Sequence, residues 1–169
     1  MKRVLTFILI LVVALVLLVG VAALIGATLP REHSASKSVL LHRPRSEVYA
    51  IVRDFESAPS WRTDIQRVEM LTMPNGKVGF REVGDHDAVT YEVSEDIPGE
   101  RLVTTITNTD LGYSGSWTYL LTDEAGGTRL TITENGEVSN VIFRFMSRYV
   151  FGHTATIDSY LASLVNRES

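Results

Sequence analysis

The chain has 169 residues, of which 16 are Lys or Arg and 20 are Asp or Glu, and it contains no cysteine. The lack of cysteine excludes disulfide bonds and thiolate catalysis. The net charge of −4, together with the absence of any basic run, argues against binding to nucleic acid.

The first predicted element is an uncharged apolar segment, residues 4–29. A helix of this length, rising about 1.5 Å per residue, spans the roughly 30 Å hydrocarbon core of a bilayer. A cleaved signal peptide is the alternative, because small residues such as Gly20, Ala23 and Ala27 lie near its end. The segment is longer than a usual signal-peptide core, and no clear A-x-A site follows it. The sequence therefore favours a transmembrane anchor over residues 1–29.

The charges that flank this segment give conflicting indications of orientation. Lys2 and Arg3 favour a cytoplasmic N-terminus. Basic residues that follow the segment have the opposite effect: Arg31, Lys37, Arg43 and Arg45. Arg43 and Arg45 belong to the expected domain, and folded domains are translocated largely regardless of charge. We therefore expect a single-pass protein with its domain outside the cytoplasm.

The remainder of the chain has the length of one domain. Residues 30–37 are polar and short and are expected to form a linker, and residues 38–169 are expected to form the domain. A first strand is predicted over residues 38–42. A helix follows it, with Pro44 suited to the first turn. Its apolar residues recur at helical spacing: Val48, Ile51, Val52 and Phe55.

Six closely spaced strands are predicted after this helix. Their ranges are residues 64–72, 78–83, 88–97, 101–109, 115–123 and 128–138. Turn signals separate them, including an Asn-Gly pair at 75–76. No helical pattern interrupts the series, so we expect an antiparallel sheet. In the last strand, Leu130, Ile132 and Glu134 share one face.

The C-terminal segment, residues 140–169, is predicted to be one amphipathic helix of about seven turns. Its apolar stripe contains Ile142, Met146, Tyr149, His153, Ile157, Tyr160 or Leu161, and Leu164. Gly152 interrupts the pattern and is expected to mark a bend or a close approach. The predicted fold is α+β: a curved antiparallel sheet of about seven strands around a long C-terminal helix, with a cavity between them.

The order of these elements resembles that of a known superfamily. The matching stretches are "RPRSEVYAIVRDFESAPSW", "DIQRVEML", "IPGERLVTTI", "GSWTYLLTDEAGGTRLTITENGEV" and "RYVFGHTATIDSYLASL". Over residues 38–165 the chain resembles the SRPBCC superfamily of START-like or Bet v 1-like helix-grip proteins. Within that superfamily it is similar to the bacterial polyketide cyclase/dehydrase and lipid-transport group. The resemblance implies a helix-grip fold. Because the group is bacterial, we expect the predicted anchor over residues 1–29 to lie in the bacterial inner membrane.

The resemblance does not by itself specify an activity, because the superfamily includes carriers, cyclases, hydrolases and ligand-gated regulators. In this fold the segment after the first helix covers the entrance of a cavity. Trp61 is expected to lie there, either facing the cavity or capping the core under a loop.

Two residues are candidates for acid–base chemistry. His153, on the apolar stripe, is a possible general base or ligand contact, although a histidine satisfied within the core is the more common arrangement. Glu134 continues the inward face of its strand, where burial would raise the pKa of its carboxyl group. The alternative is a solvated carboxylate at the strand end. A Glu134–His153 pair is the acid–base couple that the sequence suggests.

Aromatic residues are candidates for contact with an apolar ligand, because they combine an apolar body with a polar tip. The candidate ligand-binding residues are Trp61, Tyr91, Trp117, Tyr119, Tyr149 and His153. Ordinary core packing is the alternative for each of them. "GDHD" at 84–87 is expected to be a solvated turn rather than a metal site, and "GYSGSW" at 112–117 lacks the helix of a serine-hydrolase elbow. We expect no metal and no cofactor.

The sequence thus predicts a membrane-anchored domain that binds a hydrophobic small molecule or lipid in an internal cavity. One alternative is a cyclase or dehydratase that uses His153 and Glu134. Another is a partner-binding module of a membrane complex. Enzymatic activity is not predicted by any motif, and protein partners are not indicated.

Overall fold

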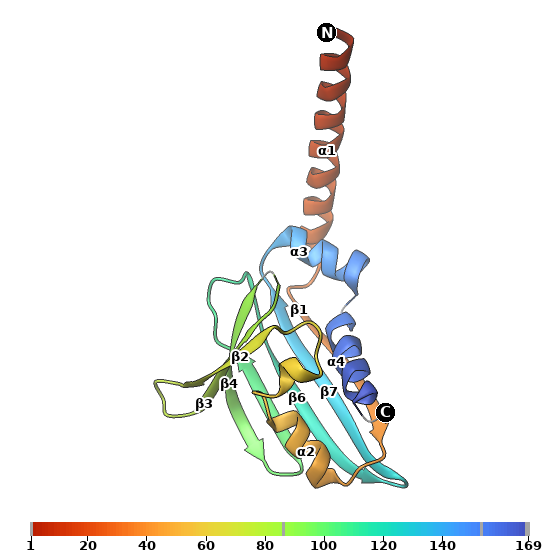
Figure 1. Ribbon diagram of the computed structural model, residues 1–169. Coiled ribbons are helices and arrows are strands. Elements are labelled where there is room, and N and C mark those ends of the chain that lie inside the picture. Colours follow the sequence, from red (N-terminus) through yellow and green to blue (C-terminus); the bar gives the residue numbers. More distant parts are fainter. Residues whose placement is uncertain (1, 86, 153, 168–169) are drawn as a thin grey trace.

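The computed structural model describes residues 2–85, 87–152 and 154–167. Its helices are α1 (Lys2–Thr28), α2 (Arg45–Arg53), α3 (Val141–Met146) and α4 (Ala155–Asn166), with a 3₁₀ turn η1 (Ala58–Ser60) and a π-helical turn η2 (Ser147–Phe151). Its strands are β1 (Glu32–Leu41), β2 (Arg67–Thr72), β3 (Val78–Val83), β4 (Ala88–Ile97), β5 (Arg101–Ile106), β6 (Tyr113–Glu124) and β7 (Gly127–Val138). Figure 1 shows α1 projecting away from a single curved domain.

Helix α1 is the one described helix that is long and apolar enough to cross a membrane. Its central side chains make no buried core with the domain and stand clear of it (Figure 1). A signal sequence near the N-terminus would meet the same criteria of length and composition. The helix is therefore a membrane-span candidate by its physical properties.

The seven strands form one antiparallel sheet in the order β1-β7-β6-β5-β4-β3-β2. The sheet curves around α2 and α4, which lie on its concave side (Figure 1). The predicted helix-grip architecture is confirmed. The predicted Asn-Gly turn is also present between β2 and β3, where Gly76 has φ 81°, a conformation that glycine adopts without strain.

The core fills only part of the concave side. Apolar residues alternate along the strands, as period-2 patterning requires, and pack against α2 and α4. The fully buried members include Leu41, Val48, Leu102, Leu121, Leu130, Ile132, Ile157 and Leu164. Val48, Val52 and Phe55, on the predicted face of α2, are buried, and Ile51 packs against the cluster.

One end of the sheet lies next to α1. Strand β1 begins at Glu32, four residues after α1 ends, and pairs with the end of β7 through Glu32 and Glu137. The antiparallel register then brings Tyr113 opposite Val138, and Val83 opposite Ala88, at this same end. We call it the α1-proximal end.

Two boundary predictions are wrong. Residues 30–37 were expected to be a linker, but β1 occupies the chain from Glu32 onwards and pairs along its length with β7. The alternation in this stretch is weak because residues 32–37 are polar on both faces of the strand, apart from the buried Ala35. The end of α1 and the beginning of the sheet are consequently separated by only a few residues.

The predicted C-terminal helix is not continuous, so its length was wrong, but the interruption expected at Gly152 is present. Helix α3 ends at Met146, passes into η2, and is separated from α4 by Gly152. Gly152 has φ 78° and ψ 155°, which no α-helix accommodates. The stripe is buried in α4 at Ile157 and Leu164, but it does not continue through η2, where Tyr149 is 60% exposed.

Helix α1 is joined to the domain through α3. A Cβ on Gly26 would lie 1.9 Å from the carbonyl oxygen of Val141, so the two helices approach closely because Gly26 has no side chain. Arg144 of α3 is buried and donates hydrogen bonds to the carbonyl oxygens of Leu29 (2.8 Å) and Ser139 (3.4 Å). Arg144 therefore holds the end of α1 against the domain.

Arg144→Gln is expected to loosen this junction. Loss of two charge-assisted hydrogen bonds costs about 2 kcal/mol. Local opening should then expose the chain around Arg31, and trypsin cleavage after Arg31 should become faster in the full-length protein. Arg148→Gln, which changes an exposed arginine in η2, is the matched control. Equal cleavage rates for the two variants would contradict the assigned role of Arg144.

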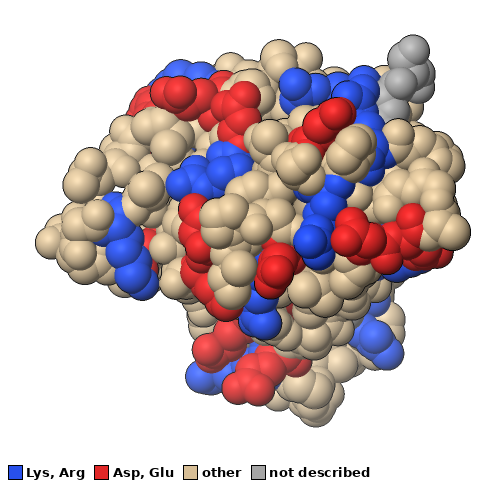
Figure 2. All heavy atoms as spheres, turned by 90° about the horizontal axis from the view of Figure 1, so that it is seen from below, with Lys and Arg blue, Asp and Glu red and all other residues tan. Residues whose placement is uncertain are grey.

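The end of the domain opposite α1 has a mixed surface. Figure 2 shows this face with Lys and Arg side chains interspersed among Asp and Glu side chains. No field of one sign covers the face in view, in keeping with the mildly acidic composition.

Candidate ligand cavity

A cavity of about 620 Å³ lies within the α1-proximal end of the domain. Its walls come from β3 to β7, from β1 at His33, from the loop before β2, and from α3, η2 and the start of α4. The lining residues are His33, Arg62, Asp64, Ile65, Glu82, Gly84, Asp87, Val89, Tyr91, Ile106, Tyr113–Trp117, Glu134, Gly136–Val138, Phe143, Ser147, Gly152, Ala155 and Thr156. A volume of this size holds a drug-sized ligand.

The cavity exists because small or short side chains replace large ones at this end. The break at Gly152 turns the chain away from the sheet, so α4 fills the concave side only from Ala155 onwards. Gly115 and Gly136 face each other across β6 and β7 and contribute no side chains to the space. The core and the cavity therefore occupy different ends of one sheet.

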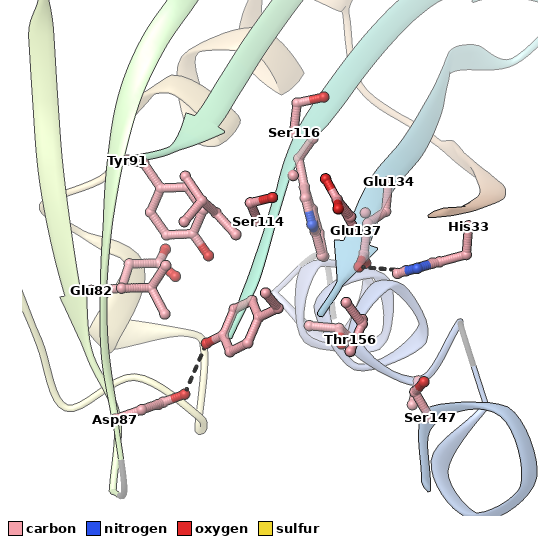
Figure 3. Close-up of a pocket in the computed structure, with 18 of the residues that line it drawn as sticks. His33, Glu82, Asp87, Tyr91, Ser114, Ser116, Glu134, Glu137, Ser147 and Thr156 are labelled. Carbon is pink, nitrogen blue, oxygen red and sulfur yellow. Dashed lines mark hydrogen bonds and ion pairs between the residues drawn. The ribbon is translucent and has the colours of Figure 1, made fainter. Parts of the chain in front are cut away.

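The side walls are mainly apolar. Val89, Ile106 and Val138 lie on inward positions of β4, β5 and β7. Tyr91 stacks on Phe80 with ring centroids 5.0 Å apart, which fixes its ring in the wall. In Figure 3 the Tyr91 hydroxyl points into the space between β4 and β6. Burial raises the pKa of Tyr91 well above its usual value, so the hydroxyl remains protonated and can donate.

Two aromatic rings meet at the edge of the cavity that we take as its mouth, because the lining residue Phe143 is 42% exposed there. Tyr113 at the start of β6 stacks against Phe143 of α3 with ring centroids 5.9 Å apart. The Tyr113 hydroxyl donates to Asp87 at 3.4 Å, which links the β3–β4 turn to β6 (Figure 3). Burial, followed by the Asp87 charge, raises the pKa of Tyr113 to about 12. These contacts join three separate segments around the opening.

A buried arginine forms one polar corner. Arg62 is 9% exposed and contacts Glu82 and Asp64, each at 2.6 Å, and its guanidinium lies 5.2 Å from the ring centroid of Tyr160. Burial lowers the pKa of Arg62, but the two carboxylates raise it by more, so Arg62 stays charged. Burial raises the pKa of Glu82, and Arg62 opposes this shift only in part.

A second polar corner lies on the opposite side of the cavity (Figure 3). His33 Nε2 lies 3.4 Å from Glu134 Oε1, and their side chains are 16% and 20% exposed. The His33 ring covers Gly136, whose added Cβ would lie 2.3 Å from its Cε1 atom. Glu134 Oε2 is buried and has no hydrogen-bond partner among the described residues. Burial raises the pKa of Glu134, and its contact with His33 opposes the shift.

Family comparison supplies the context for this geometry. Residues 32–165 match the model of the family described as polyketide cyclase / dehydrase and lipid transport. The chain belongs to this polyketide cyclase/dehydrase and lipid transport family. The resemblance to START-like helix-grip proteins is thereby confirmed.

Solved structures of the same fold include biosynthetic proteins. A START superfamily protein from Mycobacterium smegmatis is 17% identical, with a TM-score of 0.62 over 80% of this chain and 96% of that one. The ZhuI aromatase/cyclase from Streptomyces sp. R1128 is 12% identical, with a TM-score of 0.62 over 81% and 93%. The di-domain aromatase/cyclase StfQ from the steffimycin biosynthetic pathway is 12% identical, with a TM-score of 0.62 over 78% and 49%, so this chain spans about half of it. At these identities the likeness concerns the fold. No curated protein matches the chain.

This member of the family brings only some of the predicted site residues to the cavity. Tyr91, Trp117 and Glu134 line it. Trp61 and Tyr119 lie outside the lining and pack around Tyr160, at ring-centroid distances of 5.3 and 5.7 Å. Tyr149 is exposed and contacts Phe145. His153 lies outside the described residues, so the Glu134–His153 pair is neither formed nor excluded by the structure.

Three residues of the site were missed from the sequence: His33, Arg62 and Glu82. His33 lay in the segment read as a linker. Glu82 had an alternation signal, because it precedes Val83 and follows Arg81 in a strand whose inner face includes Phe80. Arg62 carried no local signal, since its burial depends on Glu82 and Tyr160, which come from distant parts of the chain.

Glu134→Gln is expected to change the pH dependence of stability. A carboxyl group with a raised pKa in the folded state is protonated more readily there than in the unfolded chain. Its stabilising contribution is therefore complete below the unfolded value of 4.5 and is lost as the pH rises through the folded pKa. The variant should be more stable than the wild type at neutral pH and lose this advantage below about pH 4.5. Urea unfolding of both proteins across this range tests it, and parallel pH profiles would contradict it.

Proposed function

We propose that this chain is a membrane-anchored binding domain for a hydrophobic small molecule or lipid. The observation that carries the proposal is the cavity of about 620 Å³, with mainly apolar side walls, at the α1-proximal end. Burying apolar ligand surface contributes roughly 25 cal/mol per Å², while a few polar groups fix orientation. Lipids, isoprenoids and polyketide-like compounds have the required character.

The position of the mouth supports a membrane source for the ligand. Helix α3 contacts both α1 and the mouth, where Phe143 meets Tyr113. Around this point the α3–η2 segment exposes large apolar side chains: Phe143, Tyr149 and Val150. Aromatic and aliphatic residues of this kind are favourable at a bilayer interface. With α1 in the membrane, the mouth would open close to the lipid headgroups.

The proposed topology has α1 crossing the bacterial inner membrane once. Lys2 and Arg3 would remain in the cytoplasm, and the domain would lie outside it. Fusion of a topology reporter to the C-terminus would report this orientation directly.

Native mass spectrometry of the full-length chain, released from mild detergent, tests the binding function. We expect a stoichiometric apolar passenger, or saturable uptake of added lipids and isoprenoids. Extraction of the same sample identifies the chemical class of the passenger. A mass equal to that of the protein alone, with no increase when lipids and isoprenoids are added, would contradict the proposal and favour a partner-binding module.

A second candidate function is acid–base catalysis on the bound ligand, of the cyclase or dehydratase type. The observation that favours it is Glu134, a carboxyl group with a raised pKa beside His33 in the cavity wall. In this case Glu134→Gln would abolish turnover and leave binding intact. Unchanged turnover of an identified substrate in that variant would contradict catalysis by Glu134.

A further inference from the structure

Acidic side chains outnumber Lys and Arg side chains in the described lining of the cavity. Among the described residues, its lining contains these carboxylates: Asp64, Glu82, Asp87, Glu134 and Glu137. Glu82 and Asp87 lie on one side of the space, and Glu134 and Glu137 lie on the other (Figure 3). Among the described lining residues, Arg62 is the one Lys or Arg side chain. Its guanidinium is occupied by Glu82 and Asp64 at 2.6 Å each. An incoming anion therefore meets no basic side chain of the described lining that is not already paired with carboxylates.

This arrangement disfavours ligands with an acidic head group. A buried anion is tolerated when a cation or several donors compensate it, and is otherwise costly to remove from water. Here the anion would approach carboxylates instead, and like charges add repulsion to the loss of hydration.

Polar atoms of the cavity that have no hydrogen-bond partner favour a head group that can donate a hydrogen bond, in contrast to an acidic one. Glu134 Oε2 is buried without a partner among the described residues, and a carboxylate oxygen accepts hydrogen bonds. On the facing wall, the Tyr91 hydroxyl points into the same space (Figure 3), and no hydrogen bond to it is found in the described part of the chain. A ligand hydroxyl or ammonium group placed between these walls would donate to Glu134, and a hydroxyl would also accept from Tyr91.

We infer that the cavity selects amphiphiles whose polar end is an uncharged alcohol or a cationic amine, and rejects those with a carboxylate or phosphate end. Glu134 accepts the hydrogen bond from that polar end. The inference rests on the proposed ligand-binding function and specifies its ligand class.

Trp117 provides a built-in reporter, because it lines the cavity and only one other tryptophan, Trp61, is present. The full-length chain is reconstituted in phosphatidylcholine vesicles, whose neutral surface does not concentrate charged probes. It is titrated with ω-bromodecanol, ω-bromodecylamine and ω-bromodecanoate, and bromine quenching of tryptophan fluorescence is measured against the concentration of each probe in the bilayer. Trp117→Phe shows which part of the quenching arises in the cavity.

Saturable quenching by the alcohol and the amine is expected. The concentration of the carboxylate that gives half-maximal quenching should be at least about tenfold higher than that of the alcohol or the amine. Glu134→Gln should reduce the preference for the amine over the alcohol and improve carboxylate binding. Glu56→Gln, which removes an exposed carboxylate outside the cavity, is the control for net charge.

The outcomes distinguish a failure of the inferred ligand class from a failure of the proposed binding function. Quenching by the carboxylate as strong as by the alcohol would overturn the inferred ligand class while leaving the binding function in place. An unchanged amine-to-alcohol ratio in Glu134→Gln would overturn the assigned role of Glu134. If none of the three probes quenches Trp117, the binding function itself fails.

Discussion

Val89→Trp is expected to abolish ligand binding while leaving the domain folded. Val89 lies on an inward position of β4 in the cavity wall, so an indole ring at this site extends into empty space instead of into packed core. The loss should be at least about 100-fold in affinity, equivalent to about 2.7 kcal/mol. Native mass spectrometry should show the bound passenger on the wild type and its loss from the variant.

Leu120→Trp is the matched control for this substitution. Leu120 is on β6 and is 43% exposed, so the same ring is added to the same sheet outside the cavity. Circular dichroism should be native-like for both variants, and passenger should remain on Leu120→Trp. Full occupancy of Val89→Trp would mean that the ligand is held elsewhere.

Arg62→Met is expected to lower the free energy of unfolding, and by more than Arg144→Gln. The substitution keeps an apolar stem but removes the charge that compensates Glu82, whose side chain is 13% exposed. Breaking a buried ion pair by removing one partner costs roughly 3–5 kcal/mol. Chemical unfolding followed by tryptophan fluorescence measures the change, because Trp61 packs against Tyr160, the ring beneath Arg62.

The destabilisation should depend on pH. Without Arg62, burial raises the pKa of Glu82 further, so the folded state binds a proton that the unfolded state releases. Stability of the variant then falls as the pH rises from the unfolded value of 4.5 through the folded pKa, and recovers in acid. A uniform loss at all pH values would indicate altered packing instead.

A double variant distinguishes the ion pair from packing. In Arg62→Met/Glu82→Gln no buried carboxylate is left at position 82, so we expect recovery of much of the lost stability at neutral pH. A double variant as unstable as Arg62→Met would contradict the assigned role of the Arg62–Glu82 contact.

Much of the fold could be predicted because its signals are local. The bounds of β3 and β4 follow from alternation between turn residues, and the buried face of α2 follows from the spacing of Val48 and Val52. β1 was detected only in its apolar second half. Its polar first half forms a strand because β7 supplies hydrogen-bond partners from Glu32 to Leu41, which is a non-local cause.

The break in the C-terminal helix shows the limit of periodicity. The stripe from Ile142 to Leu164 has helical spacing, but Gly152 adopts φ 78° and ψ 155°, a non-helical conformation that is open to glycine because it has no side chain. The close contact of α3 with Gly26 then favours a separate direction for α3. Tyr149 fits the helical spacing of the stripe, but its side chain is exposed instead of buried in the core.

The site was predicted least well because its charged residues meet across the sheet. Glu134 was recognised from alternation on a single strand, but its partner His33 comes from a strand 101 residues away. Arg62 is likewise defined by residues far apart in the chain. Such contacts depend on sheet order and register, which the linear pattern does not encode.

The central claim, that a hydrophobic ligand enters this cavity from the membrane, is tested most directly by photo-crosslinking. A long-chain alcohol with a diazirine at its apolar end is dissolved in vesicles that carry the full-length protein, irradiated, and mapped by peptide mass spectrometry. Our account predicts saturable labelling of inward residues of β4 to β7, including the peptides that contain Ile106 and Val138, with loss of this labelling in Val89→Trp. Labelling confined to α1 and the exposed α3–η2 segment would contradict it.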